Sequence, residues 1–210
     1  MILYCVRHGE STYNAEGRVQ GQSDVPLSPL GVRQGAAVAE ALREKGVEAV
    51  FTSPLRRAYQ TAELVAAAAR CPLFVEDDLK EIHAGIFQDK LRRDLEAAQP
   101  DEYRRWIGGD LDYVIPGGES RRQLAERGAA ALRRIAAAPY QTVAVIAHGR
   151  MFVVSFAALM PYEAQRIPAA LQNGSITTLK ADAATGEFRL VSADRTDHLN
   201  TVGLTGRGDL

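Results

Sequence analysis

The sequence has few cysteines, few lysines and no apolar run of membrane-spanning length. Only Cys5 and Cys71 occur among 210 residues, too few for the disulfide framework of a small secreted protein. We therefore expect two reduced thiols and a cytoplasmic protein. No apolar stretch approaches the ~20 residues that cross a bilayer, and no charged leader precedes an apolar segment. The sequence thus indicates neither membrane insertion nor export.

An excess of positive charge is also absent. The chain carries 25 basic and 26 acidic residues, a formal net charge of −1, whereas a general nucleic-acid binder relies on a broad basic surface. We expect no nucleic-acid partner. The basic residues are unevenly chosen, 21 arginines against 4 lysines. Arginine is a permanently charged, planar donor, so any anion site should be a local arginine cluster.

Apolar strands alternate with amphipathic helical segments along most of the chain. The predicted strands are 2–6, 49–52, 73–76, 142–147, 175–181 and 187–192, and the predicted helices are 29–45, 55–69, 120–138 and 152–160. This alternation is typical of an α/β three-layer sandwich, a mostly parallel sheet with helices on both faces. The turn at 184–186 predicts a terminal hairpin and so one antiparallel edge strand. The length suits a single domain over 1–210.

One stretch, 83–118, interrupts this rhythm. It contains two short polar helical segments, four aromatic residues and two glycine pairs. We expect a helical lid-like insertion that covers a site; the alternative is a pair of surface helices with no functional role. The last residues, 205–210, offer little to bury and are expected to fray.

Two histidines, His8 and His148, each follow a buried strand and precede a glycine. In open α/β sheets ligands bind beyond the carboxyl ends of the strands. Arg57 and Glu81 follow two further strands and should reach the same edge. Guanidinium groups match phosphate oxygens and lower the pKa of a nearby histidine from about 6.5, so that a neutral imidazole can act as a nucleophile. A carboxylic acid can protonate the leaving alkoxide. These residues therefore indicate phosphoryl transfer.

Several motifs occur together in a fixed order: Arg7-His8-Gly9-Glu10-Ser11, Leu27-Ser28-Pro29-Leu30-Gly31, Ser53-Pro54-Leu55-Arg56-Arg57, Leu79-Lys80-Glu81-Ile82, Pro116-Gly117-Gly118-Glu119-Ser120 and His148-Gly149. The set resembles the phosphatase branch of the histidine phosphatase superfamily, which has the phosphoglycerate-mutase-like fold. The resemblance implies a phosphohistidine on His8, Glu81 as proton donor, and neither metal nor cofactor. It implies a phosphate pocket from Arg7, Arg57 and His148, with Asn14 and Gln20 assisting. Ser11, His83 and Gly149 are further candidates for phosphate or substrate binding.

The sequence also departs from the pattern of this family. After the acid, where the family carries glycine, any residue, aromatic, glutamate and glycine, the chain reads Gly85-Ile86-Phe87-Gln88-Asp89. The substrate-facing wall should therefore differ from that of other members. Arg150 follows Gly149 directly. It either binds a second anionic group or merely lies at the start of a helix without a role in binding, and we favour the second interpretation. His83 either lines the pocket or is structural, and His198 is expected to be a loop residue.

The favoured function is a metal-independent phosphomonoesterase that acts on a small phosphorylated metabolite through a phosphohistidine. The alternative is a phosphoglycerate-type mutase with the same intermediate. The chain lacks the Tyr-Gly-x-Leu-x-Gly-x-Asn-Lys segment that cofactor-dependent mutases carry after the acid, which favours hydrolysis. A zinc site is disfavoured because no two histidines have the spacing of metal ligands. A phosphate-binding module that has lost catalysis is disfavoured because every position of the catalytic core is filled. The oligomeric state cannot be read from the sequence, which is compatible with a homodimer.

Overall fold

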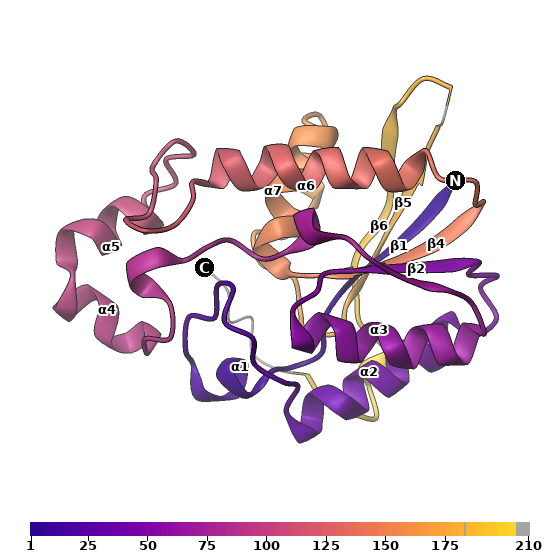
Figure 1. The fold of residues 1–210 in the computed structure, drawn as a ribbon, viewed down its shortest axis with the longest axis horizontal. Coiled ribbons are helices and arrows are strands. Elements are labelled where there is room, and N and C mark those ends of the chain that lie inside the picture. The colour runs from indigo at the N-terminus through magenta and orange to yellow at the C-terminus, as the bar shows by residue number, and fades with distance from the viewer. Residues whose placement is uncertain (183, 205–210) are drawn as a thin grey trace.

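The computed structural model describes residues 1–182 and 184–204; the expected frayed tail 205–210 lies outside the described residues. Six strands form one sheet in the order β3-β2-β4-β1-β5-β6 (Figure 1). Their bounds are β1 Ile2–Arg7, β2 Ala49–Thr52, β3 Leu73–Val75, β4 Thr142–Ala147, β5 Ile176–Ala181 and β6 Phe188–Arg195. The first four are parallel, and β5 runs antiparallel to both β1 and β6. The prediction of a mostly parallel sheet with antiparallel pairing at one edge is confirmed. The edge strand is β6, and the strand that runs against its neighbours is β5, next to that edge.

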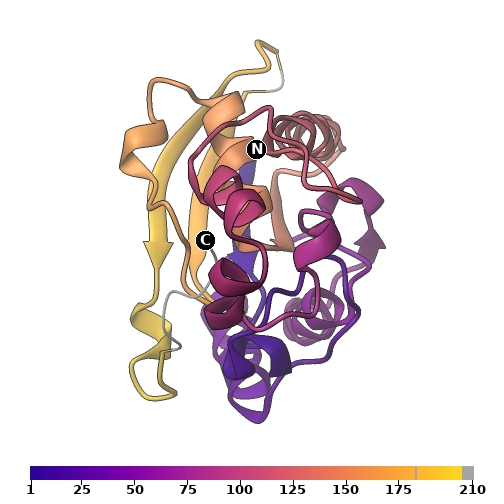
Figure 2. The same cartoon turned by 90° about the vertical axis from the view of Figure 1, so that its left-hand side faces the viewer.

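Four long helices cover the two faces of the sheet (Figures 1 and 2). On one face lie α2 (Pro29–Leu42) and α3 (Arg56–Ala69), and on the other lie α6 (Arg121–Ala136) and α7 (Gly149–Leu159). The central strand β4 serves both cores, because successive side chains of a strand point to opposite faces. Val143 and Val145 pack into the core under α6 and α7, whereas Ala144 and Ile146 pack into the core over α2 and α3. This is the predicted three-layer sandwich.

Strands β1 and β4 are paired so that their ends coincide. Arg7 lies opposite Ala147 in the parallel register, and the backbone N–H of His8 donates to the carbonyl of Ala147 at 3.0 Å. The residues that follow the two strands, His8 and His148, are therefore brought together at the carboxyl edge of the sheet. The pairing of two central strands, 140 residues apart in sequence, builds the centre of the site.

Helix α7 begins earlier than the sequence predicted. It starts at Gly149, directly after His148, and not at 152. The predicted start was wrong because Gly149 and Arg150 interrupt the apolar pattern and no side-chain cap marks the boundary. The early start has a consequence for the site: the first-turn backbone N–H groups of α7, which have no acceptor within the helix itself, lie directly after His148 in the chain.

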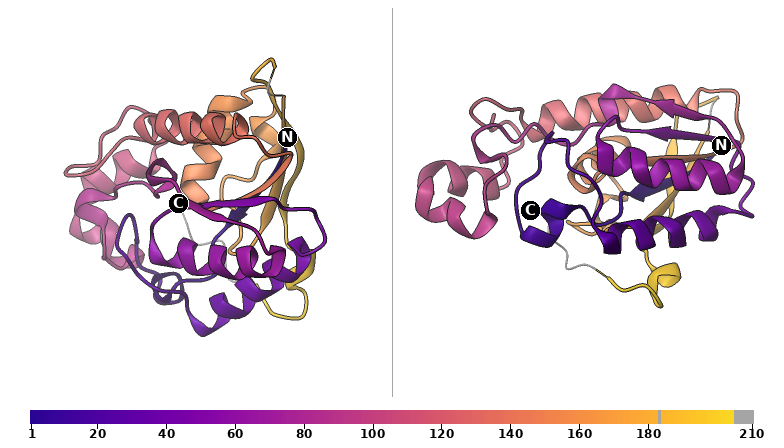
Figure 3. Two further views of the ribbon diagram at one scale, coloured as in Figure 1. Left: turned by 45° about the vertical axis from the view of Figure 1, so that its right-hand side comes forward. Right: turned by 60° about the horizontal axis from the view of Figure 1, so that its bottom comes forward.

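The insertion forms a separate helical projection at one end of the sheet (Figures 1 and 3). It contains α4 (Arg92–Ala98) and α5 (Pro100–Ile107). Its buried anchor is Trp106, which stacks on Phe87 with ring centroids 4.8 Å apart, while the hydroxyl of Tyr113 donates to Glu102. The remaining short elements are α1 (Thr12–Glu16) and the 3₁₀ helices Asp77–Leu79, Gly85–Phe87, Ala164–Arg166 and Asp197–Leu199. Within the described ranges no helix has the length and apolarity to span a membrane.

The loop after β1 touches the first turn of α2 through glycines. A β-carbon on Gly31 would overlap the carbonyl oxygen of Glu10, which is backbone and cannot swing away.

We expect Gly31→Ala to lower the free energy of unfolding by about 3 kcal/mol, because the loop that carries His8 must shift. Urea denaturation measures the change. Val32→Ala, on the same helix with a side chain half exposed, is the matched control. A Gly31→Ala protein as stable as this control would contradict the close approach.

Candidate active site

His8 is fixed by a hydrogen bond from its ring to the main chain. Its Nδ1 lies 2.7 Å from the carbonyl oxygen of Gly9, and the ring is 1% exposed. A carbonyl oxygen can only accept, so Nδ1 must carry the hydrogen. In the neutral imidazole the lone pair is therefore on Nε2. The structure thus determines which nitrogen of His8 can act as a nucleophile.

His148 lies against His8 and is completely buried. The two ring centroids are 5.1 Å apart and the ring planes are inclined by 62°. Nε2 of His148 lies 2.9 Å from Oγ of Ser53, at the end of β2, and its Nδ1 is buried without a hydrogen-bond partner among the described residues. Burial, and then the positive charge of Arg57, hold the pKa of His148 well below the usual 6.5. His148 is therefore neutral at physiological pH.

Two arginines beside the histidines are also fully buried. Nη1 of Arg7 donates to the carbonyl of Leu171. Arg57, in the first turn of α3, donates from Nη1 to Ser23 O and from Nη2 to Gly21 O, both at 2.8 Å. Buried guanidinium groups are costly unless their N–H groups are bonded, and these carbonyls fix both planes. Gly149 lies over Arg7, where a β-carbon would come within 3.3 Å of its side chain.

A strap at 171–174 holds the end of β1 in place. The N–H of Gly174 donates to the carbonyls of Arg7 and His8 at 3.0 and 3.2 Å, and Nδ2 of Asn173 donates to His8 O at 3.1 Å. His198 lies behind this strap, with Nε2 2.8 Å from the carbonyl of Gly174. His198 is thus a residue that supports the backbone of His8 from outside the cavity.

The carboxylate of Glu81 lies at the N-terminus of α7. Its Oε1 accepts from the N–H groups of Ile82 at 2.8 Å and Met151 at 3.0 Å, and its Oε2 accepts from the N–H of Arg150 at 3.1 Å. The segment that carries Glu81 is held by Arg127 of α6. Arg127 donates to the carbonyls of Asp78, Lys80 and Glu81 and pairs with Glu119 at 2.6 Å. Backbone donors therefore fix the direction of the carboxyl group, and a half-buried guanidinium fixes the segment that carries it.

These groups open into one cavity of about 360 Å³, including its mouth. His8, Arg57 and Glu81 form its floor together with the loop residues Gln20 and Gly21. The insertion supplies a wall through Arg92 and Trp106, and α7 supplies Arg150. The cavity therefore suits a small anionic ligand.

The structure brings some of the predicted residues together and places others aside. His8, Arg57, Glu81 and Gln20 line the cavity, with Arg7, His148 and Gly149 packed around them. Ser11 and Asn14 are absent from that lining and bond to each other in the cap of α1, where Asn14 Oδ1 also accepts from Asn173. His83 is absent from it too, and its Nδ1 accepts from the N–H of Gly85 at 3.3 Å.

Other residues of the site were not assigned a role from the sequence. Arg150, expected to decorate a helix start, lines the cavity instead. Ser53 belongs to a quoted motif, and its apposition to His148 depends on the β2–β4 pairing. Asn173, Arg127, Arg92 and Trp106 lie in segments without motif signals. Among the described residues no group of three or more His, Cys, Asp or Glu side chains is placed to hold a metal ion.

The fold and this site define an α/β protein with a buried, histidine- and arginine-lined pocket for an oxyanion such as a phosphoryl group. Comparison with known families agrees with that class. The model of the histidine phosphatase superfamily (branch 1) matches residues 3–194. The chain belongs to this superfamily.

Individual relatives include both phosphatases and a mutase-like protein. A probable phosphoglycerate mutase GpmB of Proteus mirabilis is 38% identical over 148 residues, 70% of this chain and 69% of that protein. A metal-independent phosphoserine phosphatase of Arabidopsis thaliana is 40% identical over 151 residues, 70% of this chain but only 63% of its own length. A mycobacterial glucosyl-3-phosphoglycerate phosphatase, solved as a complex with VO3, superposes with a TM-score of 0.82 at 30% identity, over 93% of this chain and 99% of that one.

The lowered pKa of His148 makes stability depend on pH. Below pH ~6.5 the unfolded chain binds a proton at this residue and the folded chain does not, so stability falls as the pH is lowered. We expect His148→Gln to remove up to about 1.4 kcal/mol per pH unit from the slope of unfolding free energy between pH 6.5 and 5. Urea denaturation across the pH range measures it. Above pH 7.5 the slopes should coincide; equal slopes below pH 6.5 would contradict the buried neutral histidine.

Proposed function

We propose that this chain is a metal-independent phosphomonoesterase that hydrolyses a small phosphorylated metabolite through a phosphohistidine on Nε2 of His8. The observation that carries the proposal is the bond from His8 Nδ1 to Gly9 O at 2.7 Å. It leaves Nε2 as the attacking nitrogen in a cavity lined by Arg57 and Glu81. The relatives described as phosphatases support the same reaction class.

In the first step Nε2 of His8 attacks phosphorus, and the bond from phosphorus to the leaving alkoxide oxygen breaks. Arg7, Arg57 and Nδ1 of His148 donate to the equatorial oxygens; Nδ1 carries the hydrogen of the neutral ring when Nε2 accepts from Oγ of Ser53. Preorganised positive groups in a dry site stabilise the negative charge of the transition state. In the second step water attacks the phosphohistidine, the phosphorus–nitrogen bond breaks, and inorganic phosphate leaves.

Glu81 is the proposed acid and base. Its carboxyl group lines the cavity with His8 and Arg57, and the N–H groups of Ile82, Arg150 and Met151 hold it in place. When protonated, the carboxyl group passes its proton from one oxygen to the leaving alkoxide. The same atom then takes a proton from the attacking water. Arg127 and the first turn of α7 act as positioning groups for this carboxyl.

A mutase is the second candidate, because the relative from Proteus mirabilis is described as a probable phosphoglycerate mutase. The two functions share the phosphohistidine and differ in its acceptor, which is water in a hydrolase and the bound product in a mutase. We also propose a cytoplasmic location, on the grounds of the free thiols of Cys5 and Cys71, and a homodimer stays a prediction of the sequence.

The phosphoenzyme can be trapped directly. Rapid quench with ³²P-labelled substrate should leave label on the protein through an acid-labile, base-stable bond. His8→Ala should remove the label, because His8 is the histidine among the residues that line the cavity. His83→Gln replaces a histidine outside the cavity lining and should keep the label. Label that survives in His8→Ala overturns the assignment. Isomerised ester in place of inorganic phosphate would identify a mutase.

The role of Glu81 is tested by the leaving group. Glu81→Gln keeps the shape of the side chain but cannot donate an acidic proton, so alkyl phosphates should lose about 10²–10⁴-fold in kcat. Phosphate esters of nitrophenols, whose leaving groups need no proton, should lose much less. Steady-state assays over a series of leaving-group pKa values give the slope. Equal losses across the series would count against proton donation by Glu81.

A further inference from the structure

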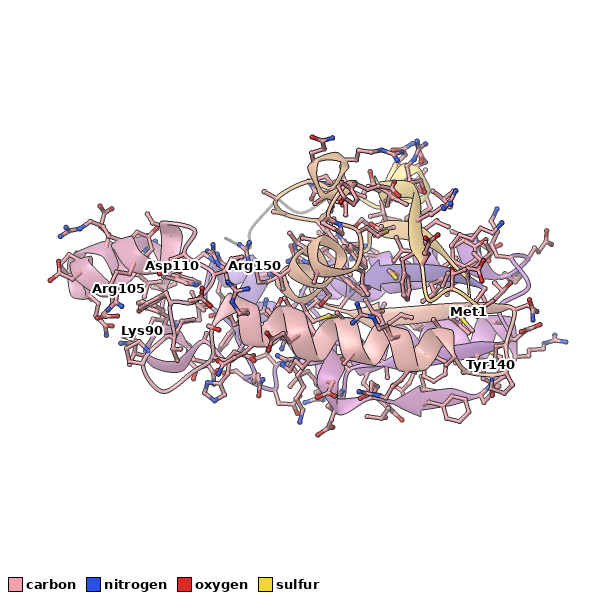
Figure 4. The ribbon with its side chains drawn as sticks, turned by 90° about the horizontal axis from the view of Figure 1, so that it is seen from above. Met1, Lys90, Arg105, Asp110, Tyr140 and Arg150 are labelled. Atoms are coloured by element: carbon pink, nitrogen blue, oxygen red, sulfur yellow. The ribbon has the colours of Figure 1, made fainter. Side chains whose placement is uncertain are left out.

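A second, larger depression shares the lining residue Arg150 with the catalytic cavity. It lies between α6 and α7, encloses about 920 Å³ including its open side, and has an apolar wall. That wall consists of Leu111, Ala125, Val153, Val154, Ala157 and Ala158. Arg150 lines both spaces, and Figure 4 shows it where the body of the molecule meets the insertion. A ligand whose phosphoryl group lies at His8 can therefore extend past Arg150 into this groove.

Arg121 lies on the same groove, at the first position of α6. Its Nη2 donates to the carbonyl of Trp106 at 2.8 Å, which fixes the guanidinium. Within the part of the chain that the structure describes, Arg121 forms no ion pair. Burial and the positive charge of Arg150 lower the pKa of Arg121. The fold thus holds two guanidinium groups close enough to repel each other, an arrangement that an anion between them would stabilise.

The next residue of α6 behaves differently. Arg122 forms an ion pair with Asp112, with Nη2 and Oδ2 2.8 Å apart, and about half of its side chain is exposed. Its charge is already balanced by a neighbour. Both arginines line the groove with Arg150, but only Arg121 has its pKa lowered by the charge of Arg150, whereas the pKa of Arg122 is raised by Asp112.

We propose that Arg121 and Arg150 form a subsite for a second oxyanion, a carboxylate or phosphate carried by the leaving alcohol of the substrate. This inference rests on the proposed phosphatase function and adds the class of substrate to it. The phosphoryl group binds at His8, the second oxyanion bridges the two guanidinium forks, and the neutral part of the alcohol lies along the apolar wall of the groove. Arg121 and Arg150 thereby determine specificity without taking part in bond cleavage.

The test compares matched pairs of esters that differ only in the second charge. Carboxylates are probed with 3-phosphoglycerate against glycerol 3-phosphate, and with phosphoserine against phosphoethanolamine. Phosphates are probed with fructose 1,6-bisphosphate against fructose 6-phosphate. We expect the intact protein to favour the anionic member of at least one pair by about tenfold to a hundredfold in kcat/KM, the effect of one or two charged hydrogen bonds. The pair that responds identifies the oxyanion.

Variants then assign the preference to residues. Arg121→Gln and Arg150→Gln should each reduce the ratio within the responding pair by about tenfold, chiefly through KM. Because the ratio is compared, a general loss of activity cancels. Arg121→Lys should retain part of the preference, and Arg122→Gln should retain all of it.

The outcomes separate this inference from the proposed function. Ratios near one in the intact protein, or an equal fall in Arg122→Gln, overturn the subsite while leaving phosphatase activity in place. Failure of the intact protein to hydrolyse any ester, including p-nitrophenyl phosphate, overturns the proposed function and with it the inference. A ratio that falls in Arg121→Gln and Arg150→Gln alone supports the subsite.

Discussion

The site depends on one hydrogen bond, from Nδ1 of His8 to the carbonyl oxygen of Gly9. That bond determines which ring nitrogen carries the hydrogen, and further hydrogen bonds hold the backbone of His8 and Gly9. The N–H of Gly9 donates to Oγ1 of Thr61 on α3 at 3.2 Å. Asn173 and Gly174 bond to the carbonyl of His8 from the other side. The backbone of His8 and Gly9 is thus held by two segments distant in sequence, and the ring cannot turn without breaking its bond to Gly9 O.

Around this bond the fold accepts an unfavourable electrostatic arrangement. Arg7, Arg57, His8 and His148 are all at most 1% exposed, although buried positive groups lose their hydration. Carbonyl oxygens of loops accept hydrogen bonds from both guanidinium groups, and burial, followed by the positive charge of Arg57, lowers the pKa of His148 and keeps it neutral. Such local conflict is a feature of functional sites, where a ligand of opposite charge relieves it. A phosphoryl group would supply the negative charge that the cluster itself lacks, which explains why the pocket suits an oxyanion.

Much of the fold could be predicted from the sequence because its signals are local. Continuous apolar runs predicted β1 and β4, the helices expected from 29 and 120 begin within one residue of those positions, and the strand ends before His8 and His148 indicated the edge that binds ligand. The contributions that were missed come from contacts distant in sequence. Asn173 and Arg127 lie outside any motif. Their hydrogen bonds to the backbone of His8 and Glu81 form only when distant segments pack together. Arg150 was misjudged because the start of α7 was placed too late, so its position on the cavity wall could not be inferred.

The central claim is that the main chain determines the reactive nitrogen of His8, and NMR of the ¹⁵N-histidine-labelled protein tests it most directly. The resting protein should show His8 protonated on Nδ1 and unprotonated on Nε2 once the ring is neutral, because Gly9 O can only accept. After reaction with substrate, ³¹P–¹⁵N coupling should appear at Nε2 of His8. Coupling at Nδ1, or a resting ring with its hydrogen on Nε2 alone, would contradict the account.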